Sequence, residues 1–235
     1  MQSSKNASLA GISLLSDLSE SALVKLSKLC HWQNYKPNEQ VIDRHSNSYD
    51  VYFIIRGRAR VVNYSISGRE VTFDDREAGG YFGELSALDS QPRSANVVAL
   101  EDMTVGRLSQ EGFNQLLIEH PKVTVKILKG LARIVRVSNN RIMDLSTLGA
   151  NNRVHAEILR LAKPGIEEDN TARISPFPIH GDMASRVSTT RETVNRVFSD
   201  LSRKGLVKRS KNDLIVLDVM RLIKMIEQVR GESDE

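Results

Sequence analysis

The hydrophobic positions of this chain follow two different spacings. Between residues 31 and 108, short runs rich in β-branched and aromatic residues alternate with turn residues, which is typical of an antiparallel sandwich or roll. On both sides of this region the apolar residues recur every three or four positions, which predicts helices. The expected strands are 31–35, 51–55, 58–64, 70–73, 96–100 and 103–108.

The helical patterns flank the strands. Ser19 is a suitable N-cap for the first helix, and Pro121 fits the first turn of a long one. Residues 1–13 are polar and Ser-rich, and we expect them to be mobile. The predicted helices cover 19–30, 110–119, 122–148, 153–163, two segments within 180–204, and 218–229.

The long helix has the spacing of a coiled coil, which suggests a homodimer. Its main seam consists of Ile127, Leu131, Ile134, Ser138, Leu145 and Leu148. A second apolar stripe is formed by Leu128, Val135 and Ile142. The polar pair Ser138 and Asn139 either fixes the register of the coiled coil or contacts a bound purine, and we prefer the second interpretation.

Residues 79–95 have the composition of a phosphate pocket. Gly83 lets backbone approach a ligand closely, and a short helix after it would present free N–H groups to an anion. Arg93 supplies a charged, planar fork for phosphate oxygens, and Ser94 adds a hydroxyl. Glu84 is an acceptor suited to a ribose hydroxyl. We expect Leu85 and Leu88 to face a core.

Two blocks in this segment, 82–85 (Phe-Gly-Glu-Leu) and 92–95 (Pro-Arg-Ser-Ala), resemble the phosphate-binding cassette of cyclic-nucleotide-binding domains. These domains are β-rolls, in agreement with the strand pattern. The resemblance implies a cyclic nucleotide as effector, with cyclic AMP as our prediction and cyclic GMP as the alternative. The implied ligand-binding residues are Gly83, Glu84, Leu85, Ser86, Arg93, Ser94, Ser138 and Asn139.

Residues 180–204 resemble a helix-turn-helix, and the strand–turn–strand that follows resembles a wing. The start of a recognition helix reaches base edges, where Arg191 suits guanine and Glu192 suits cytosine. Basic residues of the wing would meet phosphates. A solvated charged face on a helical hairpin is the alternative, and the adjacent wing argues against it. The predicted DNA contacts are Thr190, Arg191, Glu192, Asn195, Arg196 and Lys208.

Composition narrows the class of protein. The chain has 235 residues, 40% of them hydrophobic, and a net charge of +4, which permits binding to nucleic acid. A single cysteine, Cys30, excludes an internal disulfide and a four-cysteine iron–sulfur cluster, and fits a cytoplasmic protein. No apolar run is long enough for a signal peptide or a membrane span. No metal site or catalytic motif is evident, so we do not expect an enzyme.

The whole order of elements is similar to the cyclic AMP receptor protein and FNR family of bacterial transcription regulators. The resemblance implies an α+β fold divided into a β-roll (1–121), a dimerisation helix with hinge (122–150) and a winged helix-turn-helix domain (151–235). It also implies a homodimer on double-stranded DNA with a palindromic TGTGA-like site, and RNA polymerase as partner. Two residues depart from the family pattern: Asn139 beside the base, and Ser188 at the turn glycine.

Other effectors remain as alternatives. Haem would need axial ligands, and the five histidines are scattered without a paired motif. A regulatory roll attached to an enzyme is unsupported, because the winged domain uses the rest of the chain. A regulator that acts without ligand conflicts with the intact Glu84 and Arg93. The residues leave open which nucleotide is physiological, which genes are targets, whether the protein activates or represses, and what the segment after Asp218 does.

Overall fold

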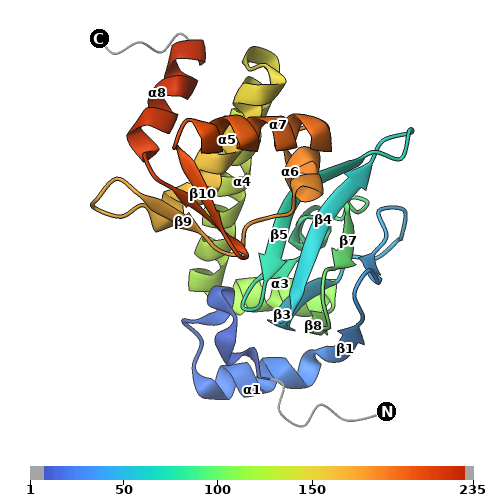
Figure 1. The fold of residues 1–235 in the computed structure, drawn as a ribbon. Helices are drawn as coiled ribbons and strands as arrows, with labels where there is room; N and C mark the ends of the chain where they lie inside the picture. Colours follow the sequence, from blue (N-terminus) through green and yellow to red (C-terminus); the bar gives the residue numbers. More distant parts are fainter. Residues whose placement is uncertain (1–7, 231–235) are drawn as a thin grey trace. The chain divides into compact units, whose positions relative to one another are not determined.

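Two four-stranded antiparallel sheets form the first half of the structure, a computed structural model that describes residues 8–230 (Figure 1). One sheet has the order β1-β8-β3-β6 and the other β2-β7-β4-β5. The strands are β1 His31–Tyr35, β2 Gln40–Ile42, β3 Val51–Arg56, β4 Arg58–Tyr64, β5 Glu70–Glu77, β6 Tyr81–Phe82, β7 Asn96–Ala99 and β8 Met103–Leu108.

Most of these strands were predicted from the sequence. β1, β4 and β8 have the expected bounds, whereas β5 continues through the polar residues Asp74 to Glu77 because they pair with the start of β4. β2 and β6 were missed, since three and two residues are too few to show an alternating pattern.

Strand β3 supplies both sides of the core in this half. Val51 and Phe53 contact the helices, while Tyr52 and Ile54 lie in the cluster between the sheets. All four side chains are buried, and full burial of a side chain of this kind is worth roughly 1.5–3 kcal/mol. A continuous apolar run in the sequence therefore corresponds to a strand covered on both faces.

The N-terminal helices close one side of the first sheet. They are the 3₁₀ turns η1 Leu9–Gly11 and η2 Ser13–Leu15, and the helix α1 Glu20–Leu29, which Ser19 caps by accepting from Ala22 N at 3.3 Å. The expectation of a mobile start is wrong for residues 8–13, because Leu9 and Ile12 are buried in the core. For residues 1–7 it lies outside the described residues.

Cys30 follows α1 and is buried, as a small apolar side chain would be. Burial raises the pKa of its thiol to about 12, so the thiol is neutral at physiological pH. This cysteine therefore serves packing.

Helix α3 Gln110–Glu119 has the predicted bounds, and helix α4 Pro121–Thr147 begins at the predicted proline. Only the first turns of α4 are buried in the core, through Val123 and Ile127. The chain divides inside α4 into two compact units, one ending at Ile134 and the other beginning at Val135.

Two residues of the predicted main seam, Ile127 and Leu148, are buried in this single chain, whereas Leu145 of the same seam is 51% exposed. The second stripe is exposed along its whole length: Leu128, Val135 and Ile142 are 58%, 58% and 60% exposed.

The second unit combines helices with a three-stranded antiparallel sheet of order β10-β11-β9. Buried residues from α5 to α8 and from the three strands form one core, including Val154, Met183 and Leu201. Its further elements are α5 Ala150–Ala162, η3 Lys163–Gly165, β9 Ala172–Ile174, α6 His180–Arg186, α7 Arg191–Arg203, β10 Val207–Ser210, β11 Asp213–Val216 and α8 Val219–Arg230.

Helix α8 is the C-terminal segment whose role the sequence left open. It lies against α5, and Val219, Leu222 and Ile226 are buried in the core of this unit. Asp218 caps it by accepting from Arg221 N at 2.9 Å. The segment therefore completes the core of the second unit.

Candidate functional site

Gly83 lies between β6 and the short helix α2 Glu84–Asp89, with a left-handed φ of 88°. A Cβ at this position would lie 2.7 Å from Asp50 O and 3.0 Å from Arg93 Nη1. Any other residue would therefore be strained in its backbone and would displace these neighbours. Glycine is required here because three chain segments meet around it.

Arg93 is the centre of this meeting point and is only 3% exposed. Its Nη1 donates to Gly83 O at 3.0 Å, its Nη2 to Asp50 O at 2.9 Å and its Nε to Ser48 Oγ at 3.1 Å. All three acceptors are neutral. Burial lowers the pKa of the guanidinium, but arginine in proteins remains protonated. Three of its five N–H groups are used, which leaves two for a ligand.

Glu84 opens α2 and is 7% exposed. Burial raises the pKa of its carboxyl, while its own backbone N–H and then the charges of Arg76 and Arg93 act in the opposite direction. The group is therefore a strong hydrogen-bond acceptor kept in a poorly hydrated place. Such an acceptor suits a hydroxyl of a bound ligand.

Helix α2 is rotated differently from the prediction. Leu85 and Leu88 were expected to face a core, but they are 37% and 38% exposed. The buried positions are instead Ser86 and Ala87, together with Glu84. The helix therefore turns its small residues inward and its two leucines outward.

The remaining predicted ligand residues lie in two places. Ser94 is exposed, and its carbonyl accepts from Asn63 Nδ2 at 3.2 Å. Ser138 and Asn139 are exposed on the part of α4 that belongs to the second unit. The first unit thus brings together Gly83, Glu84 and Arg93, whereas the pair on α4 belongs to the other unit.

Sequence reasoning missed several residues around the cassette. Ser48 and Asp50 lie in the β2–β3 loop, and Asn63 lies on β4. Arg76 lies on β5, where its Nε is 3.3 Å from Asp74 Oδ2. None of them has a recognisable spacing from the cassette.

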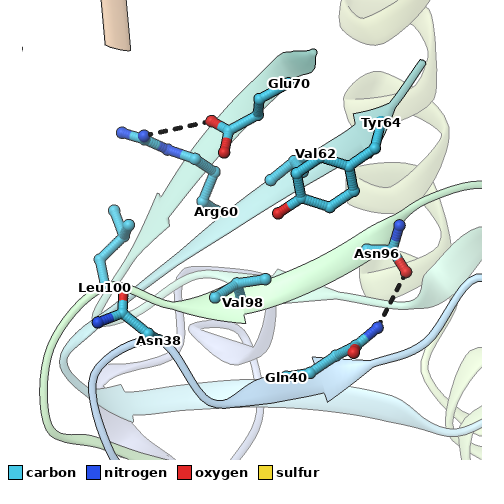
Figure 2. A pocket seen from close by; sticks show the side chains of 9 residues that line it. All are labelled: Asn38, Gln40, Arg60, Val62, Tyr64, Glu70, Asn96, Val98 and Leu100. Carbon is cyan, nitrogen blue, oxygen red and sulfur yellow. Dashed lines mark hydrogen bonds and ion pairs between the residues drawn. The ribbon is translucent and has the colours of Figure 1, made fainter. Parts of the chain in front are cut away.

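A hollow of about 320 Å³ lies on the other face of the β4 sheet (Figure 2). Its β4 residues, including Arg60 and Val62, alternate with Ala59, which is buried in the core between the sheets. Arg60 is paired with Asp75 at 2.9 Å and with Glu70 at 3.6 Å, so its charge is already balanced. This hollow contains no residue of the cassette and offers no free charge to an anion.

The predicted recognition helix is α7. Thr190 caps it by accepting from Thr193 N at 3.2 Å, and four further predicted contacts are exposed along it. Its opposite side is buried in the core, which fixes which residues point outward. The exposed residues are Arg191, Glu192, Asn195 and Arg196.

Two details modify this surface. Asn195 Oδ1 contacts His180 Nδ1, and the His180 ring stacks on Phe198 with 5.1 Å between ring centroids. Glu192 lies in the first turn, where its backbone N–H and the Thr190 hydroxyl lower the pKa of the carboxyl and keep it ionised. Lys208 is exposed on β10.

The turn between α6 and α7 explains how Ser188 replaces the expected glycine. Ser188 has a left-handed φ of 52°, which strains a residue with a side chain. Arg153 of α5 holds this turn, because its guanidinium donates to Val187 O at 2.9 Å and to Ser188 O at 3.1 Å. The same guanidinium donates to Leu148 O at 3.0 Å, so it also fixes the segment after α4.

A sheet domain with this cassette, followed by a helix-turn-helix with a wing, defines the transcription regulators that join a cyclic-nucleotide-binding domain to a DNA-binding domain. The family comparisons agree: the cyclic nucleotide-binding domain matches residues 32–120, and the Crp-like helix-turn-helix domain matches residues 152–225. The chain belongs to the CRP/FNR family. Members of this family are transcription regulators and not enzymes.

Individual relatives cover most of the chain. The cyclic AMP receptor protein of Thermus thermophilus is 32% identical over 158 residues, 67% of this chain and 70% of that protein. A CRP-like cAMP-activated global transcriptional regulator of Mycobacterium tuberculosis is 24% identical over 215 residues, 91% and 96% of the two chains. The structure of a CooA mutant from Carboxydothermus hydrogenoformans has a TM-score of 0.79 at 20% identity, covering 96% and 98%. Between residues 8 and 230, no helix is both long and apolar enough to cross a membrane.

Proposed function

We propose that this protein is a cytoplasmic, homodimeric transcription regulator whose DNA binding depends on a cyclic nucleotide. The observation that carries the proposal is the environment of Arg93. The hydrogen bonds of this buried cation all go to neutral acceptors, and the carboxylates of Asp50 and Glu84 act on it only through space. Such a cation favours an anionic ligand, because a buried charge is costly unless a hydrogen-bonded counter-charge balances it. A cyclic phosphate brings one negative charge, and the adjoining Glu84 can accept its ribose hydroxyl.

Cyclic AMP is the proposed effector, which is supported by the description of the relative from Mycobacterium tuberculosis as cAMP-activated. Ser138 and Asn139 would contact the base from α4. An amide and a hydroxyl can each donate or accept, so they can satisfy either purine. We therefore expect cyclic GMP to bind within about tenfold of cyclic AMP, or roughly 1.4 kcal/mol.

A second copy of this chain is the proposed partner of α4. Leu128, Val135 and Ile142 repeat every seven residues and are more than half exposed. Such a repeat suits a coiled coil, which buries apolar side chains between two helices. A homodimer would present two α7 helices to half-sites about one DNA turn apart, and a palindromic TGTGA-like sequence fits that symmetry.

These proposals assign a separate function to each part of the chain. Residues 1–121 would bind the nucleotide, residues 122–150 would form the dimer helix and hinge, and residues 151–235 would bind DNA and contact RNA polymerase. The nucleotide would shift an equilibrium between two arrangements of these parts, provided that it binds one of them more tightly.

The proposal is tested by calorimetric titration of the full chain with cyclic AMP and cyclic GMP, for the unaltered protein, Arg93→Leu and Arg44→Leu. Arg44 is an exposed arginine of the β2–β3 loop and serves as the matched control. Loss of the buried counter-charge should cost about 2–5 kcal/mol of binding in Arg93→Leu, with little change in the control. Equal nucleotide affinity of all three proteins would contradict the proposed pocket.

A DNA-shift assay at saturating nucleotide completes the test. Cyclic AMP should be the better activator, because its N6 amine can donate to a residue of the partner helix and guanine O6 has no hydrogen to donate. Equal activation by both nucleotides would contradict this part of the proposal.

A further inference from the structure

The β2–β3 loop, residues 43–50, wraps around Arg93 and supplies two of its three acceptors. Nε of Arg93 donates to Ser48 Oγ at 3.1 Å, and Nη2 donates to Asp50 O at 2.9 Å. The guanidinium is planar, so three acceptors in different directions fix both its position and its tilt. The loop therefore determines where the two unused N–H groups of Arg93 point.

The hydroxyl of Ser48 is itself oriented by a chain of hydrogen bonds. Ser46 Oγ donates to Asp43 O at 2.7 Å, and Ser46 Oγ lies 3.1 Å from Ser48 Oγ. A hydroxyl has one hydrogen, and that of Ser46 is used on Asp43. Ser48 must therefore donate to Ser46, which turns an oxygen lone pair of Ser48 toward Arg93.

The resulting relay runs in one direction: Arg93 Nε–H to Ser48, Ser48 to Ser46, and Ser46 to the Asp43 carbonyl. Bonds aligned in this way polarise one another and strengthen the acceptor that faces the cation. The far end is fixed by a turn, since Asp43 O accepts from Ser46 N at 3.0 Å and Asp43 Oδ1 accepts from His45 N at 2.8 Å. The relay thus ends on rigid backbone.

We propose that Ser48 is a positioning residue for the effector phosphate, with Ser46 as its support, an inference that rests on the proposed nucleotide pocket. Without the Ser48 hydroxyl, the Nε–H of Arg93 loses its acceptor in a buried place, and the guanidinium can tilt. Its two remaining N–H groups then meet the phosphate with poorer geometry. The cassette is therefore larger than the two sequence blocks, because a loop some forty residues upstream in the chain (43–50 against 83–95) completes it.

A change of nucleotide affinity in the opposite direction would also have a physical meaning. If the effector phosphate had to displace Ser48 from Arg93, the hydroxyl would compete with the ligand. Removal of the hydroxyl would then tighten nucleotide binding. The direction of the change therefore separates positioning from competition.

The test is calorimetric titration of full-length Ser48→Ala, Ser48→Thr and Ser46→Ala with cyclic AMP. Ser67→Ala is the matched control, because Ser67 Oγ makes a hydroxyl–hydroxyl contact of 2.9 Å with Ser65 in the exposed β4–β5 hairpin. We expect Ser48→Ala to weaken binding by about tenfold. Ser48→Thr keeps the hydroxyl and should retain affinity within about twofold, and Ser46→Ala should fall between the two.

A double-mutant cycle separates positioning from general damage. In an Arg93→Lys background the Nε–H is gone, so Ser48→Ala should have no further effect on affinity. Unchanged or tighter binding by Ser48→Ala, or the same loss in both backgrounds, would overturn the inference. If the unaltered protein binds no cyclic nucleotide, the proposed function fails, whereas binding that ignores Ser48 overturns the positioning role alone.

Discussion

Arg93 Nη1 donates to the carbonyl oxygen of Gly83 at 3.0 Å. This bond joins the two sequence blocks of the cassette, because Gly83 precedes α2 and Arg93, ten residues later, follows it. The guanidinium is therefore part of the local fold as well as a candidate ligand for phosphate. Changes at Arg93 are expected to affect both, which is why the exposed Arg44 is the appropriate control.

We expect the buried Glu84 carboxyl to reduce the stability of the fold while it contributes to nucleotide binding. Because its pKa is raised by burial, the folded state binds a proton more tightly than the unfolded state does. Its contribution to stability is therefore favourable at acidic pH and is lost as the pH rises through the raised pKa. Glu84→Gln should raise the Tm at pH 8 relative to the unaltered protein, and the difference should shrink toward pH 4.

The same variant should bind cyclic AMP more weakly, because an amide is a poorer acceptor for a hydroxyl than a carboxylate. Glu77→Gln, at an exposed position of β5, is the control for both measurements. Thermal unfolding at several pH values provides the first readout and calorimetry the second. A Glu84→Gln protein with unchanged Tm at pH 8 would contradict the view that this carboxyl is held at a cost.

Because of His155 of α5, we expect the folded protein to lose stability in mild acid. Burial lowers the pKa of its ring, and the charge of Lys204 adds to the effect while Asp200 opposes it. The unfolded state then takes up a proton near pH 6.5 before the folded state does, so stability decreases as the pH falls below about 6.5. Denaturant unfolding at pH 7.5 and 5.5 should show this decrease.

His155→Gln should flatten that dependence, whereas His45→Gln in the exposed β2–β3 loop should leave it intact. The free energy of unfolding of each variant at pH 5.5 is compared with its own value at pH 7.5. A loss of stability from altered packing that is the same at both pH values therefore does not affect the result. The same slope in His155→Gln and in the unaltered protein would assign the acid sensitivity to other groups.

The exposed stripe of α4 predicts the oligomeric state. Leu128→Glu combined with Ile142→Glu places charges in a coiled-coil seam and should give a monomer in sedimentation velocity. Both side chains are exposed in the single chain, so the variant should remain folded. Ile66→Glu changes an exposed apolar residue of the β4–β5 hairpin and should remain a dimer.

Leu131 is a poorer position for this test, since it packs partly against the core of the first unit. Binding of palindromic DNA should fall together with dimerisation. A Leu128→Glu, Ile142→Glu protein that sediments as a dimer would place the interface elsewhere.

Substitutions of Arg191 and Lys208 are expected to weaken DNA binding in different ways. Arg191→Ala should cost roughly 1–3 kcal/mol at one G·C pair and relax the preference there, because the guanidinium reads guanine O6 and N7. Lys208→Ala should weaken binding to all sequences alike and reduce its dependence on salt. Fluorescence anisotropy with specific, single-substituted and random duplexes distinguishes the two variants. If Arg191→Ala lost the same affinity for specific and for random DNA, the assignment of Arg191 would be refuted.

Features that depend on near neighbours in the chain could be predicted from the amino-acid sequence. The bounds of α3, β1, β4 and β8, the cap of α1 and the start of α4 follow from local spacing and cap residues. The helix-turn-helix and the cyclic-nucleotide-binding domain were also predicted, because each needs particular residue types within a short segment. The outward side of α7 follows from helical periodicity in the same way.

The side chains that meet across long separations in the chain depend on the complete fold. Ser48 reaches Arg93 because β2 and β3 fold beside α2, and no spacing rule links residues 45 positions apart. The rotation of α2, which exposes Leu85, and the burial of Ile127 and Leu148 depend on what packs against each helix. Periodicity gives the faces of a helix, but the surface that covers each face is set by the rest of the fold.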